Sequence, residues 1–145
     1  MTTTASHADG VISVRSTLPF AKTAACLLLA LERRGMTIHA RIDHAANAAS
    51  AALKLRPTQL FIFNYPEVEG AILARCPLMG VDLPRKIALW EDEAGKVWIS
   101  YNDPVWLGRR YGVGREVQTL LHAMANSFTG IALEAGGIPA HSLAR

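Results

Sequence analysis

The chain has 145 residues, of which half are hydrophobic and 19% are charged. This length and balance are typical of one globular domain with its own hydrophobic core, and they exclude a disordered or fibrous chain. The net charge is +3, but the lysines and arginines are scattered among acids and form no basic arm, so we expect no nucleic-acid partner.

Hydrophobic periodicity and turn residues predict strands and helices in alternation along the chain. Five strands are predicted, at residues 11–16, 36–43, 56–63, 85–91 and 97–101. Helices are predicted at residues 19–34, 44–53, 66–75 and 103–111, and from residue 115 onward.

The first and last predicted helices carry the clearest apolar stripes. From Phe20 to Leu31, apolar residues recur at the spacing of one helix face, and Gly35 suits the end of that helix. The same pattern runs from Val117 to Phe128, and Gly130 is expected to fray the end of the last helix.

Apolar and polar residues alternate along some of the predicted strands. The apolar residues of the second strand are predicted to share one half-buried face: Met36, Ile38, Ala40 and Ile42. The fourth and fifth strands are separated by a short turn with Gly95, which predicts a β-hairpin.

These elements predict an α+β fold, in which a largely antiparallel sheet is covered on one face by two main helices, the first and the last. A single domain is expected over residues 10–135, with flexible tails at residues 1–9 and 136–145.

Neither the cysteines nor the histidines show metal-ligand spacing, so we predict no metal site. Cys26 lies in an apolar helical pattern and Cys76 precedes a proline; a disulfide between them stays open. No signal peptide or membrane-length apolar run is visible. We therefore expect a soluble, cytoplasmic protein without a membrane partner, and its cofactor is unknown.

Polar residues at the strand ends are the candidates for a site. His44 ends the second strand and titrates near neutral pH, so it is a candidate acid or base, although it also suits a helix cap. Arg56 could clamp an anion, with Thr58 and Gln59 as hydrogen-bonding partners, or all three could be ordinary strand-entry residues.

The other end of the predicted sheet offers further candidates. Lys86 lies on a partly buried strand, either as a reactive amine or as a salt-bridge partner. Tyr101 could donate to a ligand, and Asn102 could bind a ligand or cap the following helix. A meander of strands separates this group from His44 and Arg56, so the sequence leaves open which end carries a site.

Five motifs occur in order, at residues 41–46, 55–59, 82–84, 90–92 and 100–104: RIDHAA, LRPTQ, DLP, WED and SYNDP. Together they resemble the bacterial family of domain of unknown function 302, over roughly residues 10–128. The resemblance implies a fold similar to the TATA-box-binding-protein-like class and a homodimer, and it implies no established reaction. The family often has Gly-Asn-Pro where this chain has Asn64-Tyr65-Pro66, which alters the loop there.

Three functions remain in competition. The leading one is a binding module that holds a polar or anionic small molecule in a pocket over the sheet. The second is an enzyme that uses His44 as general acid or base, with Lys86 assisting, and the sequence leaves undecided whether the chain is an enzyme. The third is a structural or self-association module with an apolar patch of Trp98, Trp106 and Tyr111.

Overall fold

The computed structural model describes residues 4–140 and shows one antiparallel sheet of six strands in the order β1-β2-β6-β5-β4-β3. The strands are β1 (Thr4–Ala5), β2 (Val11–Arg15), β3 (Thr37–Asp43), β4 (Thr58–Asn64), β5 (Arg85–Glu91) and β6 (Val97–Asn102). The helices are α1 (Phe20–Arg33), α2 (His44–Ser50), α3 (Pro66–Arg75), α4 (Pro104–Tyr111) and α5 (Arg115–Ala135), with a 3-10 turn η1 (Pro77–Val81).

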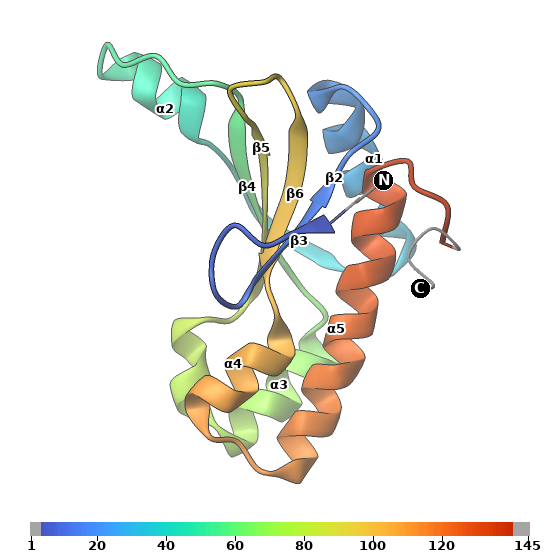
Figure 1. The fold of residues 1–145 in the computed structure, drawn as a ribbon. Helices are drawn as coiled ribbons and strands as arrows, with labels where there is room; N and C mark the ends of the chain where they lie inside the picture. Colours follow the sequence, from blue (N-terminus) through green and yellow to red (C-terminus); the bar gives the residue numbers. More distant parts are fainter. Residues whose placement is uncertain (1–3, 141–145) are drawn as a thin grey trace.

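Helices α1 and α5 pack against each other and cover one face of the sheet (Figure 1). The stripe predicted for α1 is buried at Leu27 and Leu31, and that of α5 at Leu121 and Phe128. Burial of these apolar faces stabilises the two helices in place. The predicted α+β fold, with two main helices on one side of an antiparallel sheet, is confirmed.

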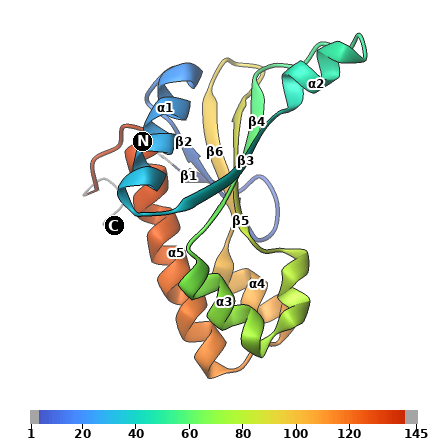
Figure 2. The same ribbon diagram turned by 180° about the vertical axis from the view of Figure 1, so that it is seen from behind.

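Helices α3 and α4 pack beside α5 at one end of the sheet, whereas α2 projects from the other end (Figures 1 and 2). Within residues 4–140, no helix is both long enough and apolar enough to cross a membrane. Both cysteines are free thiols, so the disulfide that the sequence left open is not formed.

Strand β3 departs from the predicted alternation because of a β-bulge between Ile38 and Ala40. One extra residue reverses the side to which the following side chains point. Ile38 therefore pairs with the core residue Phe63, whereas Ala40 and Ile42 face the opposite side of the sheet. The prediction that Met36, Ile38, Ala40 and Ile42 share one face was wrong.

Both predicted tails are partly ordered. Within residues 1–9, for which a flexible tail was predicted, β1 pairs with β2 through Thr4 and Ala5. At the other end, Ile138 is buried in the core and the carbonyl of Gly136 accepts bonds from Thr17, so residues 136–138 are also packed. Residues 1–3 and 141–145 lie outside the described part.

The β5–β6 turn is held by the carboxylate of Asp92. Its Oδ1 accepts the backbone N–H groups of Ala94 and Lys96, both at 2.9 Å, and its Oδ2 accepts Nε1 of Trp98 at 2.8 Å. The bond from Trp98, and then the backbone bond from Lys96, hold the pKa of Asp92 below its ordinary value of 3.8.

We expect this carboxylate to stabilise the fold only while it is ionised. Because its pKa is lowered in the folded state, its contribution is present above pH 3.8 and is lost as pH falls through the lowered pKa. Thermal unfolding of the wild type and Asp92→Asn over a pH series should show a stability gap at neutral pH that closes in acid. A gap independent of pH would contradict this assignment.

Candidate functional site

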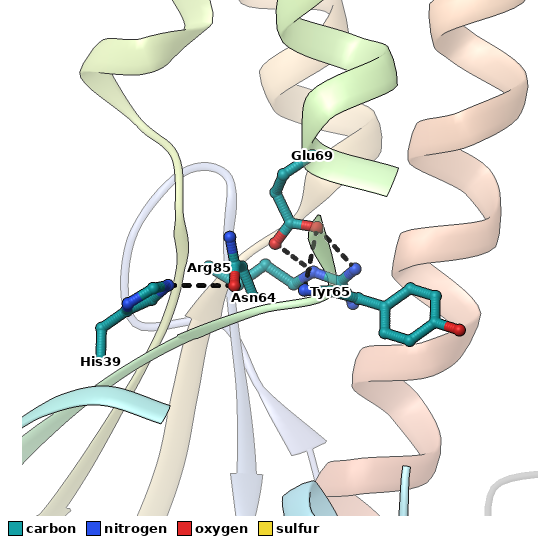
Figure 3. Close-up of polar contacts among 5 residues, drawn as sticks. All are labelled: His39, Asn64, Tyr65, Glu69 and Arg85. Atoms are coloured by element: carbon teal, nitrogen blue, oxygen red, sulfur yellow. Dashed lines mark hydrogen bonds and ion pairs between the residues drawn. The ribbon is translucent and has the colours of Figure 1, made fainter. Parts of the chain in front are cut away.

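A buried ion pair joins helix α3 to strand β5 (Figure 3). The side chains of Glu69 and Arg85 are 3% and 2% exposed. Arg85 donates from Nε to Oε2 and from Nη2 to Oε1 of Glu69, both at 2.9 Å. This two-pronged geometry fixes the plane of the guanidinium, as is usual for arginine and a carboxylate.

The local sequence explains why Glu69 turns toward the sheet. Tyr65 is the residue before α3, and Pro66 occupies the first helical position, where its missing N–H costs nothing. The backbone N–H of Tyr65 donates to Oε1 of Glu69 at 3.4 Å. A carboxylate in the first turn of a helix is also favoured by the helix dipole.

One nitrogen of the Arg85 guanidinium takes no part in this ion pair. Nη1 of Arg85 is buried and has no hydrogen-bond partner within residues 4–140. Leaving a buried donor unsatisfied costs about 1–3 kcal/mol, and more when the group is charged. Such an atom in a native fold calls for a partner such as a water or a ligand.

A cavity of about 300 Å³ lies against Arg85, between the end of α1, the start of α3 and the middle of α5. Its polar lining residues can all donate hydrogen bonds: Arg34, Tyr65, Arg85 and Ser127. The rest of the wall is apolar: Met36, Val68, Ala123 and Met124. Among residues 4–140, no carboxylate lines it, so the cavity suits a molecule with an acceptor head and an apolar body.

Arg34 is held at this cavity by two contacts with its neighbours. Its Nη1 donates to the carbonyl of Ala30 at 3.0 Å, and its Nη2 lies 2.8 Å from Glu134. A Cβ at Gly130 would come within 3.0 Å of Nη2. The expectation that Gly130 frays the last helix was wrong: α5 continues to Ala135, and Gly130 makes room for the guanidinium.

A second hollow borders the other side of the ion pair, toward the edge strand β3. It measures about 320 Å³ and is lined by His39, Asn64 and Glu69 among others. His39 Nε2 lies 3.0 Å from Oδ1 of Asn64, across the β3–β4 pairing (Figure 3). The ion pair therefore separates two hollows. Arg85 also lines a small space of about 20 Å³, enough for about one water.

The predicted residues of the first group lie at the opposite end of β4 from Arg85, because Gln59 pairs with Asp43 and Phe63 pairs with Arg85. His44 and Arg56 are exposed, and His44 begins α2 directly after its cap, Asp43.

The polar partners of this first group are engaged locally. Thr58 Oγ1 donates to the carbonyl of Arg56 at 2.9 Å, and Oε1 of Gln59 accepts from Arg41 at 2.8 Å. The cavity beside Arg85 contains none of these residues.

The second predicted group is brought together only in part, because Lys86 and Asn102 line one small space and Tyr101 does not. Lys86 donates from Nζ to the carbonyls of Asp82 and Pro84, at 3.0 and 3.2 Å. Tyr101 is in the core, stacked on Phe128 with ring centroids 4.4 Å apart, and its burial raises its pKa. Asn102 lines the small space beside Arg85, together with Lys86.

Sequence reasoning missed Glu69 and Arg85, although one signal for Arg85 was present. Every second residue of a strand points to the same face, so Arg85 had to point into the core with Ile87 and Leu89. A charge at such a position needs a partner. Nothing in the sequence pattern identified that partner as Glu69, on another element.

The comparisons with known proteins give a match to a family model and a match to a solved structure. The family model described as "Domain of unknown function DUF302" matches residues 12–129. The crystal structure of an uncharacterized conserved DUF302 protein from Bacillus stearothermophilus superposes with a TM-score of 0.80 at 15% identity. The match covers 88% of this chain and 99% of that one, and at this identity it speaks for the fold alone.

Curated relatives carry a different name. Proteins called fluoride-specific ion channel FluC 1, from Brucella suis biovar 1 and Brucella abortus biovar 1, are each 34% identical over 129 residues. The alignment covers 89% of this chain but 51% and 48% of those proteins. This chain thus spans about half the length of the curated relatives it matches.

Proposed function

Since the chain belongs to the family of domains of unknown function DUF302, we propose a function from its geometry: it is a binding module for a small organic carboxylate. One observation carries the proposal. A buried guanidinium with an unpartnered Nη1 lies against a cavity of about 300 Å³ whose polar lining residues can all donate hydrogen bonds. A carboxylate is the anion that best matches a guanidinium.

The apolar part of the wall defines the rest of the ligand. Met36, Val68 and Met124 would contact a compact apolar body, whereas the carboxylate would lie toward Arg34 and Arg85. The volume lies at the lower end of the range for small-molecule sites. Tyr65, 39% exposed, forms part of the wall.

Calorimetric titration with straight-chain carboxylates of increasing length tests the proposal. We expect saturable binding that strengthens with chain length up to the capacity of the cavity, and none with the matching alcohols. Absence of saturable binding by every carboxylate would contradict the proposal.

Arg34→Gln should weaken carboxylate binding by about tenfold or more, because it removes a charged donor from the wall. Arg33→Gln is the matched control. Arg33 is the neighbouring residue, lies 3.6 Å from the same Glu134, and does not line the cavity. Affinity measured by calorimetry should be unchanged in this control. Equal losses in both variants would indicate a general charge effect and contradict the assignment.

The name of the curated relatives offers fluoride as another ligand for this chain. A cavity of about 300 Å³ with an apolar wall is far larger than one fluoride ion, so an organic carboxylate fits it better. Fluoride in the same titration separates the two, because binding that is stronger with fluoride than with any carboxylate would replace the ligand proposed here.

The other expectations stay predictions. An enzyme that uses His44 predicts that His44→Ala abolishes a turnover while leaving the melting temperature nearly unchanged; His44 is exposed at the start of α2. The homodimer implied by the family, and the location in the cytoplasm, also stay predictions.

A further inference from the structure

The apolar side of the cavity beside Arg85 is formed largely by methionine. Its apolar lining residues are Met36, Val68, Ala123 and Met124. Leucine, isoleucine and valine are the usual large residues of an apolar interior, and of these three only valine lines the cavity. Methionine instead brings a polarisable sulfur atom, which the aliphatic side chains lack. The wall therefore differs in chemistry from that of an ordinary aliphatic pocket.

The two methionines belong to separate parts of the fold. Met124 lies in α5, is 3% exposed, and lines both this cavity and the small space beside Arg85. Met36 follows α1 and is half-buried, and its backbone N–H donates to the carbonyl of Leu31 at 3.1 Å. A ligand whose carboxylate lies toward Arg85 would therefore bring its apolar body within reach of Met124.

Tyr65 adds an aromatic ring to the same wall. Figure 3 shows this ring on the opposite side of the ion pair from His39. Within residues 4–140, the Tyr65 ring packs against no other ring. Because the side chain is partly exposed and lines the cavity, its ring is accessible to a ligand.

The aromatic patch of Trp98, Trp106 and Tyr111 considered from sequence is not accessible in the same way. Trp98 packs against a neighbouring indole, and the ring of Trp106 lies over the backbone at Gly10. Tyr111 donates its hydroxyl to Asp82. Each of the three already has its own partner, unlike the ring in the cavity wall.

These lining groups favour an aromatic ligand over an aliphatic one. A methionine sulfur is attracted to a ring at about 5 Å from its centre, often at the ring edge. Aromatic rings attract one another in offset or edge-on arrangements, and a guanidinium such as that of Arg34 is attracted to the face of a ring. An alkyl body of the same size would gain only dispersion contacts from the same groups.

The volume of the cavity suits a single ring. At about 30 Å³ for each water-sized group, a cavity of about 300 Å³ holds about ten non-hydrogen atoms. One six-membered ring with a carboxylate is of this size, whereas a ligand with several fused rings would extend out of the cavity.

We infer that the cavity binds an aromatic carboxylate, with its ring against Met36, Met124 and Tyr65 and its carboxylate toward Arg34 and Arg85. The inference rests on the proposed function, because it takes a carboxylate ligand as given and names its class. It explains why methionine and tyrosine, rather than leucine and isoleucine, form the wall opposite the donors.

Calorimetric titration of the full chain with benzoate and with cyclohexanecarboxylate tests the inference. The two acids have the same number of carbon atoms and the same charge, and they differ in whether the ring is aromatic. We expect benzoate to bind about tenfold more tightly, because each sulfur–aromatic contact contributes up to about that factor.

Replacing the thioethers locates the source of this preference. Met36→Leu/Met124→Leu nearly conserves the volume of the wall. It should lower the preference for benzoate by about threefold or more and leave the affinity for cyclohexanecarboxylate nearly unchanged. Met36→Leu alone, at the half-buried position, should lower the preference by less and spares the core. Met79→Leu is the matched control, since Met79 is fully buried and does not line the cavity.

The titrations distinguish a failure of this inference from a failure of the proposed function. No binding of either acid, or of any other carboxylate, would overturn both. Equal binding of the two acids would overturn the aromatic class and leave the carboxylate site in place. A preference for benzoate that survives both methionine variants, or that falls equally in Met79→Leu, would show that the thioethers do not select the ligand and would also overturn the inference.

Discussion

Arg85→Met is expected to lower the free energy of unfolding by about 3–5 kcal/mol, because it leaves the carboxylate of Glu69 buried without its partner. Both side chains are almost fully enclosed, and two hydrogen bonds of 2.9 Å join them. Chemical denaturation of the wild type and the variant, with a shared slope, measures the difference.

Two controls distinguish a buried pair from charge in general. Arg75→Gln removes one partner of the exposed Arg75–Glu116 pair and should cost about 0–1 kcal/mol. The double variant Glu69→Leu/Arg85→Met removes both buried charges and should recover most of the lost stability. If Arg85→Met cost no more than Arg75→Gln, the pair would not hold α3 to β5.

The buried pair of Glu69 and Arg85 limits how the proposed site can be tested. An Arg85 variant that binds no carboxylate could have lost either the ligand or the fold. Arg34, whose side chain is 28% exposed, avoids this ambiguity, because its pairing with Glu134 contributes little to stability. Binding should therefore be compared in Arg34 variants, and stability in Arg85 variants.

Phe63→Ala is expected to cost about 3–5 kcal/mol of unfolding free energy through the cavity it leaves. Phe63 is fully buried, and its ring meets that of Phe128 edge-on at 5.9 Å, so it joins β4 to α5. Phe63 is also the cross-strand partner of Arg85. The variant should therefore hold Arg85 less firmly in the proposed carboxylate site.

Ile62→Ala is the matched control on the same strand. Ile62 points to the open face, which is the face of the sheet that α1 and α5 leave uncovered, and is only partly buried, so we expect a loss smaller than that of Phe63→Ala. Denaturant unfolding at low protein concentration supplies that comparison. Equal losses would mean that the open face is as well packed as the core, contrary to the structure.

Local pattern was enough to predict most of the fold. The residues of β5 and α3 were predicted to the residue, and the β5–β6 hairpin followed from alternation and Gly95. These features depend on interactions between near neighbours in the chain, which the order of apolar and polar residues records directly. For the same reason, the two amphipathic helices predicted that one face of the sheet is covered by helices.

The candidate site was not predictable in this way. The polar residues predicted at the strand ends, His44 and Arg56, are exposed. The cavity is lined instead by Arg34, Tyr65 and Arg85, which lie on separate elements.

The sequence by itself determined the α+β architecture, the elements other than β1 and η1, and the strands that form the hairpin. Only the tertiary structure decided that Glu69 is the partner of Arg85, that Gly130 accommodates Arg34, and that a bulge at β3 turns Ala40 and Ile42 onto the open face. The reason is physical. Periodicity reports burial along one element, whereas a cavity, an ion pair or an extra strand residue depends on which distant segments come into contact when the chain packs.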